Sequence, residues 1–208
     1  FMKNYHIGCG YKIGKNWFNY DVSPIAFIDK FDLLNKFLKL NSKRFPKEII
    51  FGDITKKKLC EENDADNIYL SHVLEHLSRD KAIIALQNIY LMLKPGGCFR
   101  VIVPSLSERI REYQKNNDGD RFMKSLGCVN EHEDKSFWHK LRFLIGNSRH
   151  KWMYDEKSLL RLLQMTGFKN IQQCTYNDSK IEVFSEVEEQ GRFFENNCYF
   201  AVAMQCSK

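Results

Sequence analysis

Two glycines separated by one residue lie between two short apolar runs near the start of the chain. Gly8 and Gly10 follow the run Tyr5–Ile7. The second run, Trp17–Tyr20, ends at the acid Asp21. Glycine allows a sharp turn and lets a ligand approach main-chain N–H and C=O groups without meeting a Cβ atom. The pattern therefore predicts a strand, a turn with exposed backbone, a second strand and a carboxylate at its tip.

The short distance between the two runs limits the ligand that this turn can hold. Eight residues, 11 to 18, separate Gly10 from Asn19, whereas a parallel crossover that includes a helix needs about a dozen. A dinucleotide site places its pyrophosphate on the N-terminus of such a helix, so NAD and FAD are disfavoured. An acid at the second strand tip can hold a ribose diol. The stretch predicts a site for a nucleoside without phosphates, such as S-adenosylmethionine, with a plain glycine turn as the alternative.

Composition is typical of one globular domain spanning residues 1–208, with 43% hydrophobic and 28% charged residues. The apolar runs are far shorter than the ~20 residues that span a bilayer, and the start FMKNYHIG contains no secretory signal, so we expect a cytoplasmic protein. Seven cysteines without a C-x-x-C pair predict reduced, mostly buried thiols, and no metal site is expected. The net charge of +6 suits a solvated lysine-rich surface, an acidic substrate or nucleic acid.

Short apolar runs alternate with helical patterns along most of the chain. Asp155 is the expected N-cap of a helix whose buried face includes Leu159 and Met165. This alternation predicts an α/β sheet that is mainly parallel. Besides the two runs above, strands are expected over residues 48–51, 67–70, 98–103, 168–175 and 198–205, and helices over residues 24–41, 78–94 and 155–167.

Two further stretches are candidates for ligand contact. Asp53 follows the third strand, where it could accept a hydrogen bond from the exocyclic amine of adenine while Ile54 stacks on the ring; an ordinary turn aspartate is the alternative. Residues 105–150 interrupt the alternation and are charged and aromatic. They are expected to form a lid or substrate cap, or an insertion that only thickens the fold.

Several motifs in one order resemble the class I S-adenosylmethionine-dependent methyltransferases, in particular the small methyltransferases linked to glycan or secondary metabolism. The resemblance covers about residues 4–104 and 152–206. Its motifs are HIGCG, NYDVSP, GDIT, SHVLEHL, LKPGG and TGFKN.

The resemblance implies a Rossmann-like α/β sheet of seven strands, mainly parallel with an antiparallel last strand, a shortened first crossover and an insertion after strand 5. It also implies that S-adenosylmethionine is the cofactor. This sequence departs from the family pattern at two positions, since His6 stands where an acid or amide is usual and Lys12 where a glycine is usual. The cofactor-binding residues that the resemblance implies are Gly8, Cys9, Gly10, Asp21, Val22, Asp53, Ile54, Ser71 and His72.

Methyl transfer from a sulfonium is an in-line displacement, so the protein mainly supplies alignment and a dry pocket. A base is needed only if the acceptor is a hydroxyl or a charged amine. His72 and His150 are the candidate catalytic residues, with His132 as another candidate, because the ordinary pKa of histidine is near 6.5. A surface or core histidine is the alternative for each. The expected acceptor is a small molecule or a glycan-type compound.

Three other functions remain open. His72 to His76 matches the H-x-x-E-H signature of zinc peptidases, but His72 directly follows a strand and the helical pattern begins only at Ser78. Basic and aromatic residues alternate between Phe137 and Trp152, which is compatible with RNA methylation or nucleic-acid binding. A cofactor-binding pseudoenzyme that serves as a partner module is the third possibility, supported by His6 and Lys12.

Overall fold

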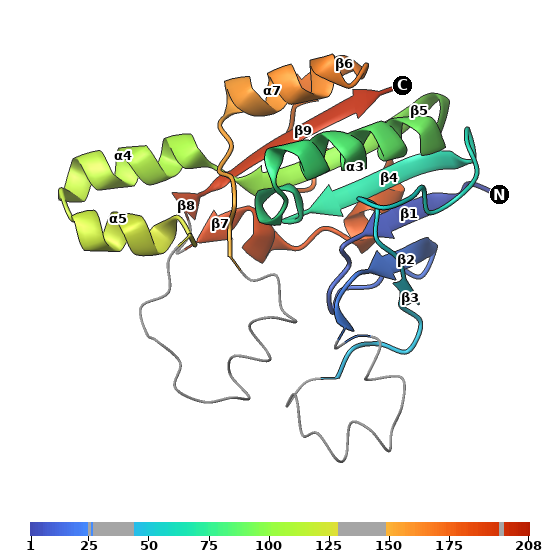
Figure 1. Ribbon diagram of the computed structural model, residues 1–208, viewed down its shortest axis with the longest axis horizontal. Coiled ribbons are helices and arrows are strands. Elements are labelled where there is room, and N and C mark those ends of the chain that lie inside the picture. The colour runs from blue at the N-terminus through green and yellow to red at the C-terminus, as the bar shows by residue number, and fades with distance from the viewer. Residues whose placement is uncertain (25, 27–43, 129–148, 196–197) are drawn as a thin grey trace.

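The computed structural model describes residues 1–24, 26, 44–128, 149–195 and 198–208. In this part of the chain, a seven-stranded sheet has the order β3-β2-β1-β4-β5-β9-β6 (Figure 1). Strand β9 is antiparallel to both of its neighbours, and the other pairs are parallel. This confirms the predicted Rossmann-like methyltransferase sheet. The strands are β1 (Asn4–Ile7), β2 (Trp17–Asp21), β3 (Ile50–Phe51), β4 (Ala65–Ser71), β5 (Leu93–Pro104), β6 (Lys169–Gln173) and β9 (Ala201–Ser207).

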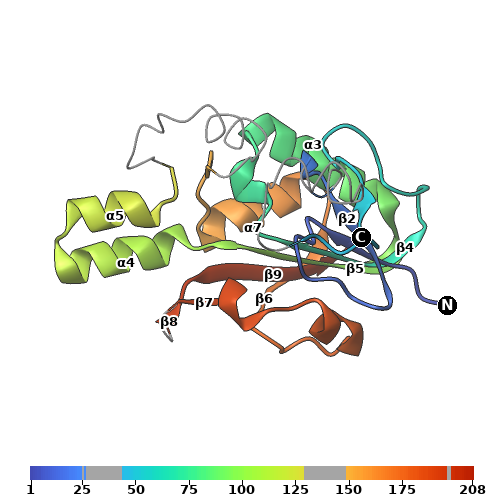
Figure 2. The ribbon, with the colours of Figure 1, turned by 90° about the horizontal axis from the view of Figure 1, so that it is seen from below.

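Different elements cover the two faces of the sheet (Figure 2). Helices α3 (Arg79–Met92) and α7 (Glu156–Met165) lie on one face, above a core of fully buried aliphatic and aromatic side chains. The opposite face is covered by the connection between β6 and β9, which contains two short 3₁₀ helices, η2 (Glu182–Glu186) and η3 (Gln190–Arg192). Phe184 and Phe193 from this connection pack against Trp17 and Tyr69 of the sheet. The connection, whose course the sequence does not predict, is therefore part of the core.

A buried ion pair fixes the connection to the sheet. Arg100 of β5 is fully buried and donates hydrogen bonds to the carboxylate of Glu188, to Asp178 and to the carbonyl oxygen of Thr175. Buried charges are tolerated only when they are paired and hydrogen-bonded in this way. The network holds the chain just before η3 at a defined place over the sheet.

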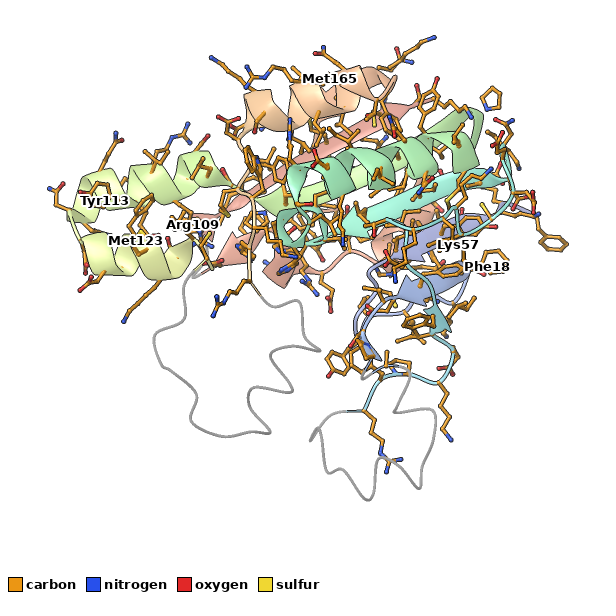
Figure 3. The ribbon with its side chains drawn as sticks, viewed as in Figure 1. Phe18, Lys57, Arg109, Tyr113, Met123 and Met165 are labelled. Carbon is orange, nitrogen blue, oxygen red and sulfur yellow. The ribbon has the colours of Figure 1, made fainter. Side chains whose placement is uncertain are left out.

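Helix α7 begins as predicted and buries a narrower face than predicted. The Asp155 side chain accepts a hydrogen bond from Ser158 N at 2.7 Å, and Ser158 Oγ completes a capping box. Leu159, Leu162 and Leu163 are buried. Met165, by contrast, is 74% exposed and points away from the sheet (Figure 3), so its predicted place in the buried face is wrong. Met165 lies outside the stripe that Leu159, Leu162 and Leu163 form along one face of the helix.

Several predicted strands have different bounds, and the strand expected over residues 98–103 begins at Leu93, so it includes the predicted LKPGG turn. The strand expected over residues 48–51 is reduced to Ile50–Phe51, because Ile49 N donates to the carbonyl oxygen of Pro46 in a turn. The strand expected over residues 198–205 begins only at Ala201. Cys198–Tyr199 forms the separate strand β8, which pairs with β7 (Phe194–Glu195) in a hairpin.

The insertion after β5 begins with two helices, α4 (Leu106–Asn116) and α5 (Gly119–Ser125). They pack against each other and project beyond the sheet (Figure 1). The rest of the predicted cap, residues 129–148, lies outside the described residues, and so does most of the helix predicted over residues 24–41, of which Pro24 and Ala26 are helical. All seven cysteines are free thiols. In the described part of the chain, every helix is too short or too polar to span a bilayer.

Candidate functional site

The main cavity lies at the carboxyl ends of the parallel strands. Its volume is about 380 Å³, within the range of roughly 300–1,000 Å³ that is usual for small-molecule sites. In sheets of this kind ligands bind at this edge because the loops that follow the strands meet there. Residues from four strand ends line the cavity, namely Gly8, Asp21, Val22, Asp53, His72 and His76.

The turn after β1 needs glycine at its first position. Gly8 has a φ of +72°, and a Cβ atom built there would lie 2.3 Å from Cγ2 of Val73. The backbone N–H groups of Gly8 and Cys9 donate to the carbonyl oxygen of Tyr20 at 2.8 and 3.0 Å. The predicted glycine turn is therefore present without a helix between the two strands, and these two N–H groups tie it to β2.

The carboxylate of Asp21 fixes the tip of β2 against this turn. Gly10 N donates to Oδ2 at 2.8 Å, and Ser23 N donates to Oδ1 at 2.7 Å. Each carboxylate oxygen can accept more than one hydrogen bond, so both keep acceptor capacity toward the cavity. Val22, beside it, is half-exposed and lines the same wall. These hydrogen bonds hold Asp21 in place before any ligand arrives.

Asp53 and Ile54 have different surroundings. Asp53 lines the cavity, and its Oδ1 accepts hydrogen bonds from the backbone and hydroxyl of Thr55 at 2.9 and 2.7 Å. The Ile54 side chain is buried in the core against the α3 side of the sheet and is not among the cavity-lining residues. Thr55, which sequence reasoning missed, takes the place on the cavity wall next to Asp53.

A smaller cavity lies beneath the glycine turn. Cys9, Lys12 and Ser71 line it together with His6. Burial lowers the pKa of His6 to about 3, so this ring is neutral at physiological pH. Ser71 Oγ is buried and has no hydrogen-bond partner among the described residues. The cavity therefore combines a neutral ring with polar groups.

Glu189 and Arg192 also line this smaller cavity, and both reach a third cavity beside His72. They come from the connection between β6 and β9, and Arg192 Nε lies 3.7 Å from Glu189 Oε2. Sequence reasoning missed both, because this irregular connection has neither a hydrophobic period nor a recognisable motif.

His72 follows β4 in a left-handed conformation with a φ of +54°, which is uncommon for a residue other than glycine. Its Nε2 donates to the carbonyl oxygen of Arg192 at 2.8 Å, and its Nδ1 lies 3.2 Å from Glu75 Oε1. The ring lines the main cavity. Backbone strain of this kind persists where the surrounding structure holds the residue firmly.

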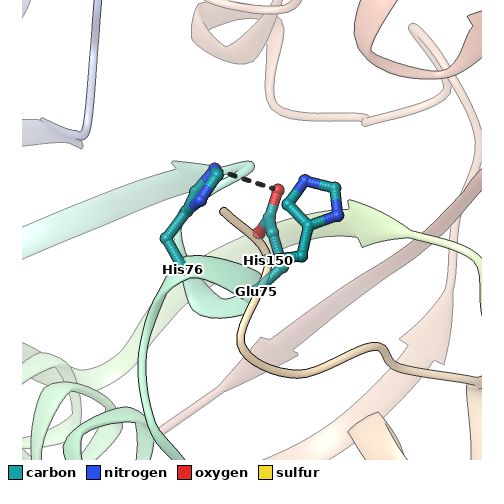
Figure 4. A group of neighbouring side chains, drawn as sticks. All are labelled: Glu75, His76 and His150. Carbon is teal, nitrogen blue, oxygen red and sulfur yellow. Dashed lines mark ion pairs between the residues drawn. The ribbon is translucent and has the colours of Figure 1, made fainter. Parts of the chain in front are cut away.

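His150 lies beside Glu75 and His76 and is not among the residues that line the cavities (Figure 4). Its Nδ1 donates to the carbonyl oxygen of Leu126 at 2.7 Å, and burial lowers its pKa. Glu75 is completely buried in η1 (Leu74–His76). We call Glu75, His76 and His150 the histidine–carboxylate corner.

The H-x-x-E-H stretch does not form the helix of a zinc peptidase. His72 belongs to the end of β4, Glu75 and His76 to η1, and α3 begins only at Arg79. The two histidines therefore do not share one helical face, as that peptidase motif requires. Of the aromatic and basic stretch, Lys151 lines the main cavity, while residues 137–148 lie outside the described part.

Comparison with known proteins agrees with the fold. A family model described as "Methyltransferase domain" matches residues 7–173. The structure is similar to an S-adenosylmethionine-dependent methyltransferase from Archaeoglobus fulgidus, with 14% identity, a TM-score of 0.51 and coverage of 100% of this chain and 86% of that chain. It is also similar to a methyltransferase from Methanosarcina mazei, with 13% identity, a TM-score of 0.53 and coverage of 99% of this chain and 92% of that chain. YcgJ from Bacillus subtilis has 11% identity, a TM-score of 0.51 and coverage of 100% of this chain and 92% of that chain. None of the curated proteins matches the sequence significantly.

Proposed function

The chain belongs to the family of S-adenosylmethionine-dependent methyltransferases, and we propose that it methylates a small-molecule or glycan-type acceptor in the main cavity. The cavity supports this proposal because it joins the glycine turn and Asp21 to His72 within one space. A methyl donor held by the glycine turn and Asp21 would present its methyl group toward His72. Positioning of this kind supplies about 7 to 11 kcal/mol toward an in-line displacement.

The cofactor would lie along the strand ends with its adenosyl group toward β2 and β3. The Asp21 carboxylate would accept hydrogen bonds from the two ribose hydroxyls, and Val22 and Asp53 would contact the adenine. Ile54 would support this wall from the core side. A bare turn with no following helix favours such a ligand over one with phosphates.

The methionine end of the cofactor would extend over the glycine turn toward the smaller cavity. Cys9 and Gly10 would offer backbone carbonyl oxygens there, because their N–H groups already donate to Tyr20 and Asp21. Ser71 Oγ, which is buried without a hydrogen-bond partner in the described part, would gain one. Glu189 can accept from the amine of the methionine, and Arg192 can donate to its carboxylate. These two residues would replace the acid that the family usually carries at the position of His6.

The acceptor would enter between His72 and the segment 105–150, which we propose as the substrate cap. His72 is the proposed base for a hydroxyl acceptor, since its ring borders the cavity. Because His72 Nε2 donates to the Arg192 carbonyl oxygen at 2.8 Å, a base at this position would accept the proton at Nδ1, the nitrogen that lies 3.2 Å from Glu75 Oε1. His150, which has no place on the cavity wall, is the weaker candidate. The cytoplasm is the proposed compartment, and nucleic acid is not a proposed partner.

Titration calorimetry with S-adenosylmethionine and S-adenosylhomocysteine tests the proposal. We expect both to bind with one site per chain, and Asp21→Asn to weaken both, because one ribose hydroxyl loses its charged partner. Absence of heat at millimolar ligand would favour the pseudoenzyme. Transfer of a labelled methyl group to sugars and small hydroxylated compounds, with single-stranded RNA in parallel, then identifies the acceptor class. Labelling of RNA alone would contradict the proposed acceptor.

A further inference from the structure

The carboxylate of Glu75 is buried without the hydrogen bonds that a buried charge requires. Its side chain has no exposed surface, and neither Oε1 nor Oε2 accepts a hydrogen bond from the described residues. The side-chain nitrogen atoms near Oε1 are His72 Nδ1 at 3.2 Å and His76 Nε2 at 3.9 Å. A buried ionised carboxylate is costly unless it is paired, hydrogen-bonded or bound to a metal. This part of the structure therefore calls for a positive group.

Two histidines beside Glu75 present ring nitrogens of the kind that bind metals. His76 Nδ1 lies 3.1 Å from the carbonyl oxygen of Arg149, and His150 Nδ1 lies 2.7 Å from that of Leu126. A carbonyl oxygen only accepts, so each Nδ1 carries the hydrogen, and in the neutral ring each Nε2 carries the lone pair. Metal-binding histidines almost always donate their other N–H to a carbonyl or carboxylate in this manner.

The three side chains are close enough to share one ion. One ligand atom from each of Glu75, His76 and His150 lies within 4.8 Å of the others. Two ligand atoms of a tetrahedral zinc ion with bonds of about 2.0–2.1 Å are roughly 3.3 Å apart. Side-chain rotations that move the ligand atoms by less than about 2 Å would therefore complete the site. Figure 4 shows the His76 and His150 rings on either side of the Glu75 carboxylate.

From this arrangement we propose that Glu75, His76 and His150 bind one divalent transition-metal ion. Two imidazoles and one carboxylate suit Zn²⁺, Mn²⁺ or Fe²⁺, whereas Mg²⁺ and Ca²⁺ prefer oxygen ligands alone. His76 also lines the main cavity, so a coordination position of the ion faces the space proposed for the acceptor. Such an ion would bind an acceptor oxygen and lower the pKa of its hydroxyl; this role, unlike metal binding itself, rests on the proposed function.

Among the described residues, His72 and His76 are the basic side chains within ion-pair distance of the Glu75 carboxylate. His72 lies within ion-pair distance of one carboxylate oxygen of Glu75, Oε1. The other ring nitrogen of His72 is hydrogen-bonded to the carbonyl oxygen of Arg192. Lys151 N and Trp152 N donate to the backbone carbonyl of Glu75 and not to its carboxylate. His72 is therefore a neighbour that orients Glu75, and it is outside the proposed set of ligands.

Cobalt substitution tests the site without any methyl acceptor. The protein is stripped with a chelator and titrated with Co²⁺, and d–d absorption and calorimetry report coordination and stoichiometry. We expect one ion per chain, displaced by Zn²⁺ and not by Mg²⁺. Glu75→Gln and His150→Gln should each weaken binding by more than about 100-fold, because removal of an outer-shell partner alone costs 10- to 100-fold.

Matched controls separate this result from unfolding and from unrelated metal binding. Glu61→Gln removes an exposed carboxylate and should bind Co²⁺ as the wild type does. His72→Asn removes the neighbouring ring at a φ that asparagine tolerates; it should keep one ion per chain and lose less affinity than the ligand variants. Circular dichroism and thermal unfolding check that each variant is folded, independently of cofactor binding. Equal Co²⁺ affinity in Glu75→Gln and wild type would overturn the proposal, and so would a sulfur-to-cobalt charge-transfer band, which indicates cysteine ligands. Failure of cofactor binding with intact metal binding would instead contradict the proposed function alone.

Discussion

The two ends of the main cavity differ in how their polar groups are satisfied. At the cofactor edge, which we define as Gly8, Gly10 and Asp21, the Asp21 carboxylate accepts two backbone hydrogen bonds of 2.7 and 2.8 Å. At the histidine–carboxylate corner, the Glu75 carboxylate is fully buried and accepts none from the described residues. The first end is complete within the chain, whereas the second depends on a further charged group.

This difference teaches how each end would respond to change. Local hydrogen bonds fix the conformation of the cofactor edge, so the proposed cofactor would bind with little further ordering of these residues. The corner is assembled from η1 and the segment before α7, which meet only in the folded chain. Substitutions at the edge should therefore act on cofactor affinity, and those around the corner on catalysis and metal binding.

The largest expected effect is that of His72→Asn, at the junction of the two ends. Loss of a general base typically costs about 10²- to 10⁴-fold in rate, and we expect kcat to fall in that range while cofactor affinity stays within about 3-fold. Steady-state kinetics with calorimetry measures both quantities. An equal loss of kcat and cofactor affinity would place His72 at the cofactor edge and break the comparison.

Asp21→Ala should act at the other end. Hydrogen bonds to a charged group contribute about 1.5–3 kcal/mol, so we expect cofactor affinity to fall about 10- to 100-fold. Calorimetry with S-adenosylhomocysteine measures this loss, and cobalt titration of the same variant should match the wild type. A parallel loss of cobalt binding would show that the two ends are one coupled unit.

The buried ring of His6, which lies beneath the cofactor edge, predicts that the free energy of unfolding depends on pH. Its folded-state pKa is lowered to about 3, below an unfolded value near 6.5. Between these two pKa values the unfolded chain binds a proton that the folded chain does not. The contribution of His6 to the free energy of unfolding is therefore complete above pH 6.5 and is lost toward pH 3, by about 1.4 kcal/mol per pH unit. Urea unfolding of wild type and His6→Gln across this window should show a shallower slope in the variant. Identical slopes would contradict the neutral ring.

The smallest expected effect is that of Glu75→Gln on the metal-free protein. The amide keeps the shape and removes a buried charge that lacks hydrogen bonds, so the metal-free variant should be at least as stable as the metal-free wild type. Thermal unfolding in the presence of a chelator measures this change. A destabilisation of several kcal/mol would show that the Glu75 carboxylate is already well paired within the chain, as Asp21 is.

The cofactor edge was predictable from the sequence because its parts are local. The glycine spacing, the short connection to β2 and the acid at the strand tip are all present within residues 8–21. Asp155 likewise allowed the start of helix α7 to be predicted, because an aspartate at this position caps a helix N-terminus. In each case neighbouring residues determine the backbone conformation, and a short pattern is sufficient.

The corner was not predictable, since it depends on tertiary packing. The sequence indicated the H-x-x-E-H residues but placed no metal there, and nothing in the pattern of residues 105–150 brings His150 beside Glu75. Glu189 and Arg192 were missed for a similar reason, because the ion pair between Arg100 and Glu188 holds their segment over the sheet. Ile54 was predicted to stack on adenine, whereas its side chain is buried in the core and is not among the cavity-lining residues.

The contact between Gly8 and Val73 has a consequence for how such a site can diverge. A methyl group of Val73 fills the space where a Cβ atom of Gly8 would lie. The turn after β1 and the loop that leads from β4 to the histidines are therefore in direct packing contact at this point. A larger residue on either side displaces both loops at once. New acceptors would therefore be accommodated by changes in the proposed cap, with the spacing between these two loops unchanged.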